Sequence, residues 1–121
     1  MPAAVNYRLA AIIKNMKEAD KMNNRIFTIQ DIKALVLPIA QKYKIKEIYL
    51  FGSYARGEAN ESSDLDFLVF GGENFKLTMI FALAEELRDV LKKDVDVFEI
   101  NEIDQDSDFY YTVMKERLLV A

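Results

Sequence analysis

The amino-acid sequence predicts an α/β (α+β) protein in which helices pack on a small mixed β-sheet. The first observation is the order of hydrophobic patterns, which runs helix, helix, strand, strand, helix, strand, helix along the 121 residues. The second is the length of the connections. A helix of about 16 residues joins the second and third strands, as in a right-handed parallel crossover, whereas the roughly 12 residues between the first two strands favour antiparallel neighbours.

The N-terminal part of the chain predicts a helix from about Tyr7 to Met22. Its apolar residues recur at helical spacing and share one face. They are Leu9, Ile12, Ile13 and Met16. We therefore expect a helical extension over residues 1–27 and a main domain over residues 28–121.

A second helix is expected from Thr28 to about Tyr43. Thr28 is a favourable N-cap, and Asp31 stands three residues later in a capping-box arrangement. Pro38 lies inside this helix and is expected to kink it. The apolar stripe consists of Ile32, Leu35, Val36 and Ile39.

Three short segments rich in β-branched and aromatic residues predict the strands, Ile45–Phe51, Asp64–Phe70 and Asp94–Ile100. The small, polar segment 54–63 predicts a turn or short helix followed by a loop. Gly71 and Gly72 end the second strand.

Two more helices complete the predicted fold. Asn74 is a candidate cap for a helix whose apolar residues keep helical spacing from Leu77 to Leu91. After an acidic loop, the residues from Phe109 to Leu119 predict a closing helix.

Composition and charge exclude several classes of function. The chain has no cysteine and no histidine, which excludes thiolate zinc sites, cysteine nucleophiles and histidine catalysis. The net charge of −4 argues against a broad grip on nucleic acid, which needs a basic surface. No apolar run approaches the roughly 20 residues of a membrane helix, and the N-terminus lacks a signal-peptide layout. We therefore expect a cytoplasmic protein without membrane contact.

The predicted topology gathers carboxylates at one edge of the sheet. Asp64 and Asp66 begin the second strand and point to the same face, because side chains alternate along a strand. Asp94 and Asp96 begin the parallel third strand beside them, and the sequence leaves open which of the two completes the cluster. Like charges this close need a cation between them, and oxygen ligands suit Mg²⁺ or Mn²⁺.

A turn suited to phosphate binding is expected next to these carboxylates. Gly52 permits close approach of the backbone, and Ser53 offers a hydroxyl and N–H groups. Arg56 either adds a phosphate contact or forms a surface ion pair with Glu58 or Glu61. Carboxylates beside such a turn indicate phosphoryl or nucleotidyl transfer.

The motif resembles that of a known family. Gly52 and Ser53 are followed, after ten residues, by Asp64-Leu65-Asp66, and residues 95–97 form a further Val-Asp-Val segment. This pattern is similar to the minimal nucleotidyltransferase (MNT) family of the DNA polymerase β superfamily. The resemblance extends from about Ile29 to the C-terminus and implies a nucleotidyltransferase fold like the polymerase β palm.

The resemblance also implies roles for individual residues. Asp64, Asp66 and Asp96 would be catalytic and would bind two Mg²⁺ ions, while Gly52 and Ser53, with the nearby arginine, would bind a nucleoside triphosphate, expected to be ATP. An acceptor hydroxyl would attack the α-phosphorus and release pyrophosphate. MNT proteins are often antitoxins that transfer AMP to a tyrosine of a HEPN-domain RNase toxin.

Two alternatives remain open at this point. One is a partner-binding module with weak or no catalysis, which an Asp64→Asn variant that still neutralises its partner would reveal. The other is nucleotidyl transfer to a small molecule, although related enzymes of that kind carry a second helical domain. An uncovered edge strand or the N-terminal helix would also allow a homo-oligomer.

Overall fold

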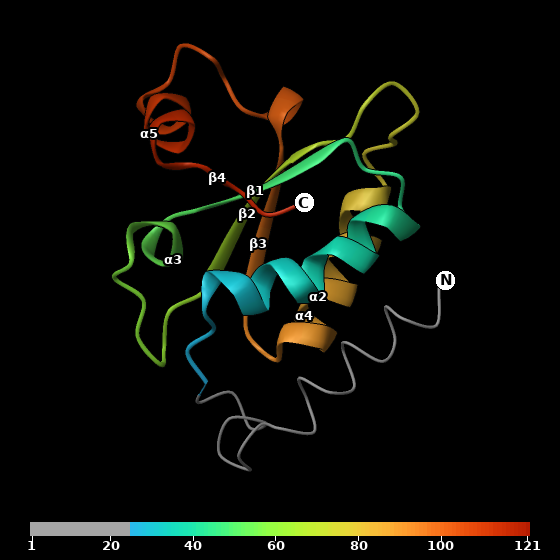
Figure 1. Ribbon diagram of the computed structural model, residues 1–121. Coiled ribbons are helices and arrows are strands. Elements are labelled where there is room, and N and C mark those ends of the chain that lie inside the picture. The colour runs from blue at the N-terminus through green and yellow to red at the C-terminus, as the bar shows by residue number, and fades with distance from the viewer. Residues whose placement is uncertain (1–24) are drawn as a thin grey trace.

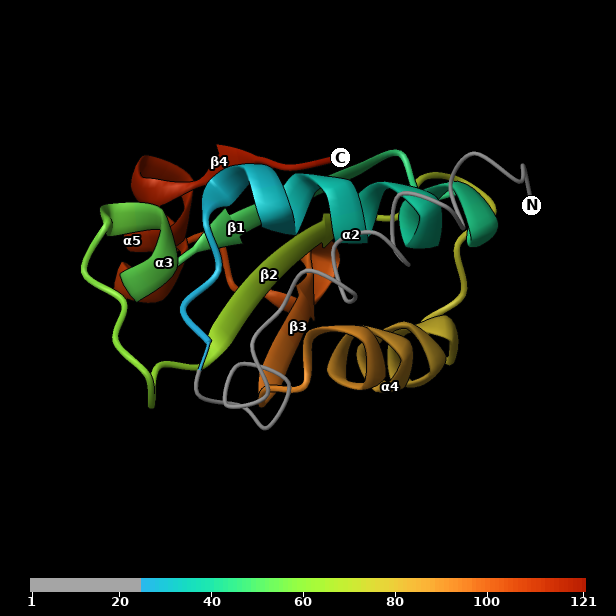
Figure 2. The ribbon, with the colours of Figure 1, turned by 60° about the horizontal axis from the view of Figure 1, so that its bottom comes forward.

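The computed structural model describes residues 25–121, which form a four-stranded mixed sheet flanked by helices (Figures 1 and 2). The helix predicted over residues 7–22 lies outside the described residues, so the division at residue 27 stays a prediction. Within the described range, every helix is too short or too polar to cross a lipid bilayer.

The sheet has the predicted topology, with one added strand. Its order is β3-β2-β1-β4, from Val95–Glu99 through Leu65–Phe70 and Glu47–Phe51 to Leu118–Leu119. β1 pairs antiparallel with β2, and β2 pairs parallel with β3. The two connection lengths therefore predicted the strand directions correctly.

Helix α2 (Ile29–Lys42) begins at the capping box expected from the sequence. The backbone N–H of Asp31 donates to Oγ1 of Thr28 at 3.1 Å, and the N–H of Thr28 donates to Oδ2 of Asp31 at 3.3 Å. These bonds satisfy N–H groups that the first helical turn leaves without partners. Pro38 lies inside the helix, which continues to Lys42.

Two predicted element starts are wrong. The first strand begins at Glu47, since the chain is still turning at Lys44 (φ 54°) and Ile45 bonds back to Ala40. Helix α4 (Met79–Leu91) begins after Thr78, so Asn74 does not cap it.

The predicted closing helix is also shorter than expected. Helix α5 runs from Asp108 to Glu116, capped by the Ser107 side chain, and Arg117 then adopts an extended conformation. The next two residues form β4, which pairs antiparallel with β1. The edge of β1 is therefore covered, and β3 and β4 form the two edges of the sheet.

The two faces of the sheet carry separate hydrophobic clusters. Helices α2 and α4 lie side by side over one face, where the larger cluster includes Phe67 and Leu83 (Figure 2). The smaller cluster includes Leu68 and Val113 of α5 and lies on the opposite face. Because side chains alternate along β2, Asp66 shares this second face with Leu68.

Candidate active site

Two aspartates face each other across neighbouring strands. Asp66 of β2 and Asp96 of β3 are paired residues in the parallel register, so their side chains share one face of the sheet. Asp64 is exposed and directly precedes β2, and Asp94 directly precedes β3. The Asp94 carbonyl accepts a hydrogen bond from Leu65 N–H at 3.0 Å. The structure therefore places Asp96, rather than Asp94, opposite Asp66.

The glycine–serine turn lies against the same carboxylates. Phe51, the last residue of β1, is the paired residue of Asp66, and Gly52 follows with φ 77° and ψ −155°. A β-carbon at Gly52 would collide with Oδ2 of Asp66. Only glycine combines this backbone conformation with so close an approach. Ser53 then begins the short helix α3 (Ser53–Arg56).

The carboxyl group of Asp66 has an unusual affinity for its proton. Burial, followed by the negative charges of Asp96 and Asp64, raises the pKa of Asp66 to about 6, against the opposing effect of Arg56. Burial and neighbouring anions both disfavour the ionised carboxylate. A bound cation would relieve the same repulsion, so the donor set fits a divalent metal bound by oxygen.

The candidate ligands suit a metal ion by their chemical type, although they do not already form a coordination cage. Within residues 25–121, no three acidic side chains already converge closely enough to hold a metal ion. The candidate ligands Asp64, Asp66 and Asp96 lie at the starts of two adjacent strands, and two of them are exposed. Their oxygen donors suit Mg²⁺ or Mn²⁺, which prefer carboxylate and water ligands.

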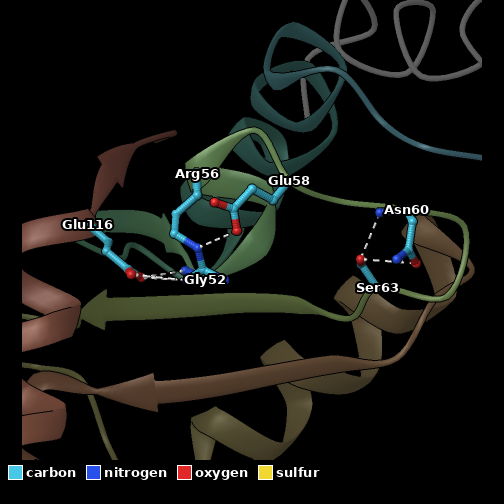
Figure 3. Close-up of polar contacts among 6 residues, drawn as sticks. All are labelled: Gly52, Arg56, Glu58, Asn60, Ser63 and Glu116. Atoms are coloured by element: carbon cyan, nitrogen blue, oxygen red, sulfur yellow. Dashed lines mark hydrogen bonds and ion pairs between the residues drawn. The ribbon is translucent and has the colours of Figure 1, made fainter.

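Arg56 lies at the other end of α3 and forms ion pairs in this structure (Figure 3). Its Nε contacts Glu58 Oε2 at 3.0 Å, one of the alternatives that the sequence left open. Its Nη1 also contacts Glu116 Oε1 at 3.0 Å. The same Glu116 accepts a hydrogen bond from the Gly52 N–H at 3.2 Å through Oε2.

Sequence reasoning did not identify Glu116. This residue lies 60 positions beyond Arg56, at the end of α5, and belongs to none of the local motifs. No signal in the sequence marks it, because its position depends on the pairing of β4 with β1, which places the end of α5 beside the end of β1.

Aromatic side chains border the carboxylates, and sequence reasoning missed these residues as well. The rings of Phe51 and Phe98 lie 6.0 Å apart between centroids. Phe109 of α5 packs on both, at 5.9 Å and 5.3 Å. Phe51 is paired with Asp66, and Phe98 stands two residues after Asp96 on the same face. These rings provide the site with an apolar wall.

The loop before Asp64 is held by local hydrogen bonds. The N–H of Asn60 donates to Ser63 Oγ at 2.8 Å (Figure 3). The N–H of Ser62 donates to Asn60 Oδ1 at 2.9 Å. An open cavity of about 490 Å³ lies beside it, lined by residues 61–64, Arg88 and residues 92–94. The cavity extends the site beyond Asp64 with both acidic and basic groups.

Several known proteins are similar to this chain in sequence or fold. The Methanocaldococcus jannaschii protein MJ0435, named as a protein adenylyltransferase, is 41% identical over 91 residues, covering 75% of this chain and 90% of that protein. A solved structure described as a minimal nucleotidyltransferase is 27% identical, with a TM-score of 0.64 over 76% of this chain and 95% of the other.

A third comparison shares the fold at lower identity. It is a chain in the structure of tri-AMPylated Shewanella oneidensis HEPN toxin in complex with MNT antitoxin, 21% identical with a TM-score of 0.60, covering 78% of this chain and 72% of the other. The family model described as polymerase beta, nucleotidyltransferase matches residues 34–121. The chain therefore belongs to the polymerase β nucleotidyltransferase family and is a nucleotidyltransferase.

Proposed function

We propose that this nucleotidyltransferase transfers AMP from ATP to a tyrosine hydroxyl of a HEPN-domain toxin, with Mg²⁺ as its cofactor, and thereby acts as an antitoxin. The observation that carries the proposal is the contact of Gly52 with Asp66, together with the pairing of Asp66 and Asp96. It supports a site in which cation-binding carboxylates lie beside a phosphate-binding turn.

The relatives support both the transferred group and the partner. MJ0435 carries the name of a protein adenylyltransferase, and the Shewanella oneidensis HEPN toxin is AMPylated in complex with its MNT antitoxin. A family relation at 41% identity favours the same reaction class for this chain. The HEPN partner and the tyrosine acceptor are proposals that rest on this likeness.

Each site residue has a role in the proposed reaction. Asp64, Asp66 and Asp96 would hold Mg²⁺, which would screen the negative charge of the triphosphate and of the transition state. Ser53 binds the triphosphate with its hydroxyl and N–H groups, because the turn at Gly52 brings the backbone close to the carboxylates. Arg56 supplies a positive charge at the end of α3.

The chemical step is an in-line displacement at phosphorus. The acceptor oxygen forms a bond to the α-phosphorus as the bond to the bridging oxygen of pyrophosphate breaks. Asp96 takes the proton of the attacking hydroxyl, and pyrophosphate leaves with the electron pair of the broken bond. The products are an AMP–tyrosine phosphodiester and pyrophosphate.

The test uses ATP labelled on the α-phosphate, Mg²⁺ and lysate of the source organism as the supply of acceptor. We expect one labelled protein band, with AMP on tyrosine by mass spectrometry. Asp66→Asn should reduce labelling by at least about 100-fold, because it removes a charge from the metal site. The matched control is Asp89→Asn, an exposed aspartate on α4 across the sheet, which should label normally.

Other outcomes would select the alternatives. Label on a small molecule would replace the protein acceptor. If the folded protein captures a HEPN-domain partner without labelling it, and the Asp64→Asn variant captures that partner equally well, the protein is a binding module. Equal labelling by Asp66→Asn and the wild type would contradict the assignment of the site.

A further inference from the structure

We infer that Glu116 is a positioning residue for the nucleotide, because it holds both Arg56 and the Gly52 turn in place from the end of α5. The inference rests on the proposed function. The Glu116 carboxylate accepts hydrogen bonds from Gly52 N–H at 3.2 Å and from Arg56 Nη1 at 3.0 and 3.2 Å (Figure 3). These two donors belong to the turn and helix that are proposed to bind phosphate.

The direction of the Gly52 N–H follows from the pairing of β1 with β4. Ile48 of β1 bonds to the segment that follows β4. Its N–H donates to the Ala121 carbonyl, and its carbonyl accepts from the Val120 N–H, both at 2.9 Å. Leu50 is paired with Leu118 in the same ladder. Because N–H groups alternate along a strand, that of Gly52 points to the same side, away from β2. Glu116 thus replaces the acceptor that a longer β4 would provide.

Gly52 is consequently fixed from two directions. Its α-carbon faces the Asp66 carboxylate so closely that no side chain fits between them. Its N–H is bound by Glu116 on the side of β4. A backbone hydrogen bond to a charged acceptor is stronger than one between neutral groups. The turn before Ser53 is therefore held before any nucleotide arrives, which reduces the entropy lost on binding.

Arg56 is oriented mainly by the same carboxylate. Its two partners differ in exposure, since the Glu58 side chain is 65% exposed and the Glu116 side chain is 19% exposed. Exposed ion pairs contribute little, whereas a shielded carboxylate that binds two donors fixes an arginine more firmly.

If Glu116 competed with the nucleotide, the same contacts would have the opposite effect on nucleotide binding. The donors that hold Glu116 are of the kind that bind phosphate, so Glu116 could instead compete with the nucleotide for them. Removal of a competitor would tighten nucleotide binding, whereas removal of a positioning residue weakens it. The direction of the Gly52 N–H, toward β4 rather than toward Asp66, favours the positioning role.

The experiment measures binding of α,β-methylene ATP with Mg²⁺ to the full chain by calorimetry, and KM and kcat for ATP in the labelling assay. Glu116→Ala should weaken binding by about 10-fold or more, because it removes a charged partner from two donors. The rise in KM should exceed the fall in kcat. Glu116→Gln keeps an acceptor for Gly52 and should give an intermediate loss. The control Glu58→Gln should stay within about twofold of the wild type.

A double variant shows whether Glu116 acts through Arg56. If it does, Arg56→Ala combined with Glu116→Ala should lose less affinity than the product of the two single losses. If the double variant instead loses affinity by the full product of the two single losses, Glu116 acts only on the Gly52 turn. That result would contradict the part assigned to Arg56.

Binding by a folded Glu116→Ala variant that equals or exceeds that of the wild type would overturn the inference. If Glu116→Ala does not fold, Glu116→Gln decides, and wild-type affinity in that variant overturns it. A folded wild-type protein that binds no nucleotide would instead contradict the proposed function, and the inference would fall with it.

Discussion

Gly52 and Asp66 lie so close that a side chain at residue 52 would collide with the Asp66 carboxylate. The contact lies at the end of the β1–β2 ladder, where Phe51, the last residue of β1, is paired with Asp66. It also explains why the glycine of the Gly-Ser pair is required by geometry: Gly52 has a positive φ and faces a carboxylate that needs room for a ligand.

The first prediction concerns Gly52→Ala. We expect the variant to lose at least about 2 kcal/mol of unfolding free energy, because strain at a positive φ adds to the collision. Labelling activity should fall with it. Gly57→Ala is the matched control, since Gly57 has φ 73° but open space around it. That variant should lose only about 1 kcal/mol in urea unfolding. Equal losses in the two variants would show that the collision is relieved by movement of Asp66.

The second prediction follows from the raised pKa of Asp66, about 6. The folded protein binds this proton more tightly than the unfolded chain, so the ionised group destabilises the fold above pH 6, and this effect disappears as pH falls toward 4. Asp66→Asn should therefore raise the unfolding free energy at pH 8. Because the side chain is partly exposed, the expected gain is only about 1–2 kcal/mol.

Urea unfolding at pH 8, 6 and 4 checks this prediction. The gain of Asp66→Asn should shrink between pH 6 and pH 4, and Asp89→Asn should show no comparable trend. A gain of the same size at all three values would mean that the variant stabilises through packing and that the charge of Asp66 is not the cause.

The third prediction concerns the aromatic wall. Phe109 packs on Phe51 and Phe98 beside Asp66, so Phe109→Ala should admit water to this part of the site. We expect the pKa of Asp66 to decrease toward the usual range and the unfolding free energy to fall by about 1–2 kcal/mol. Carboxyl titration by NMR measures the pKa. Tyr111→Ala, on the same helix and 77% exposed, should leave it unchanged. If the pKa of Asp66 is unaltered in Phe109→Ala, the aromatic wall is not the cause of the raised pKa.

Local chemistry in the sequence predicted much of the fold. Thr28 and Asp31 form the expected capping box because its hydrogen bonds connect residues three apart, and such bonds depend little on the rest of the molecule. The approach of Gly52 to Asp66 also follows from local rules, since strand direction and side-chain alternation together bring the turn to the carboxylates.

The end of the chain could not be predicted in this way. Leu118 and Leu119 continue an apolar pattern from α5, and two residues are too few to show the alternation of a strand. They leave the helix because the N–H and C=O groups at the edge of β1 offer pairing that the helix cannot match. The position of Glu116 depends on the pairing of β4 with β1, so no local sequence motif could predict it.

The last prediction decides between the two candidates for the third carboxylate. Asp96 is paired with Asp66 inside the sheet, whereas Asp94 lies before β3 and contributes its carbonyl to the bond with Leu65. Asp96→Asn should therefore reduce labelling by about 100-fold or more, as expected when a catalytic carboxylate is removed, and Asp94→Asn by only a few-fold. Rates measured at saturating ATP and Mg²⁺ separate this loss from weaker binding. Because Asp94 and Asp96 lie two residues apart and share a face of the strand, the reverse result would mean that the site opens toward the cavity lined by Asp64 and Asp94 rather than over Asp66.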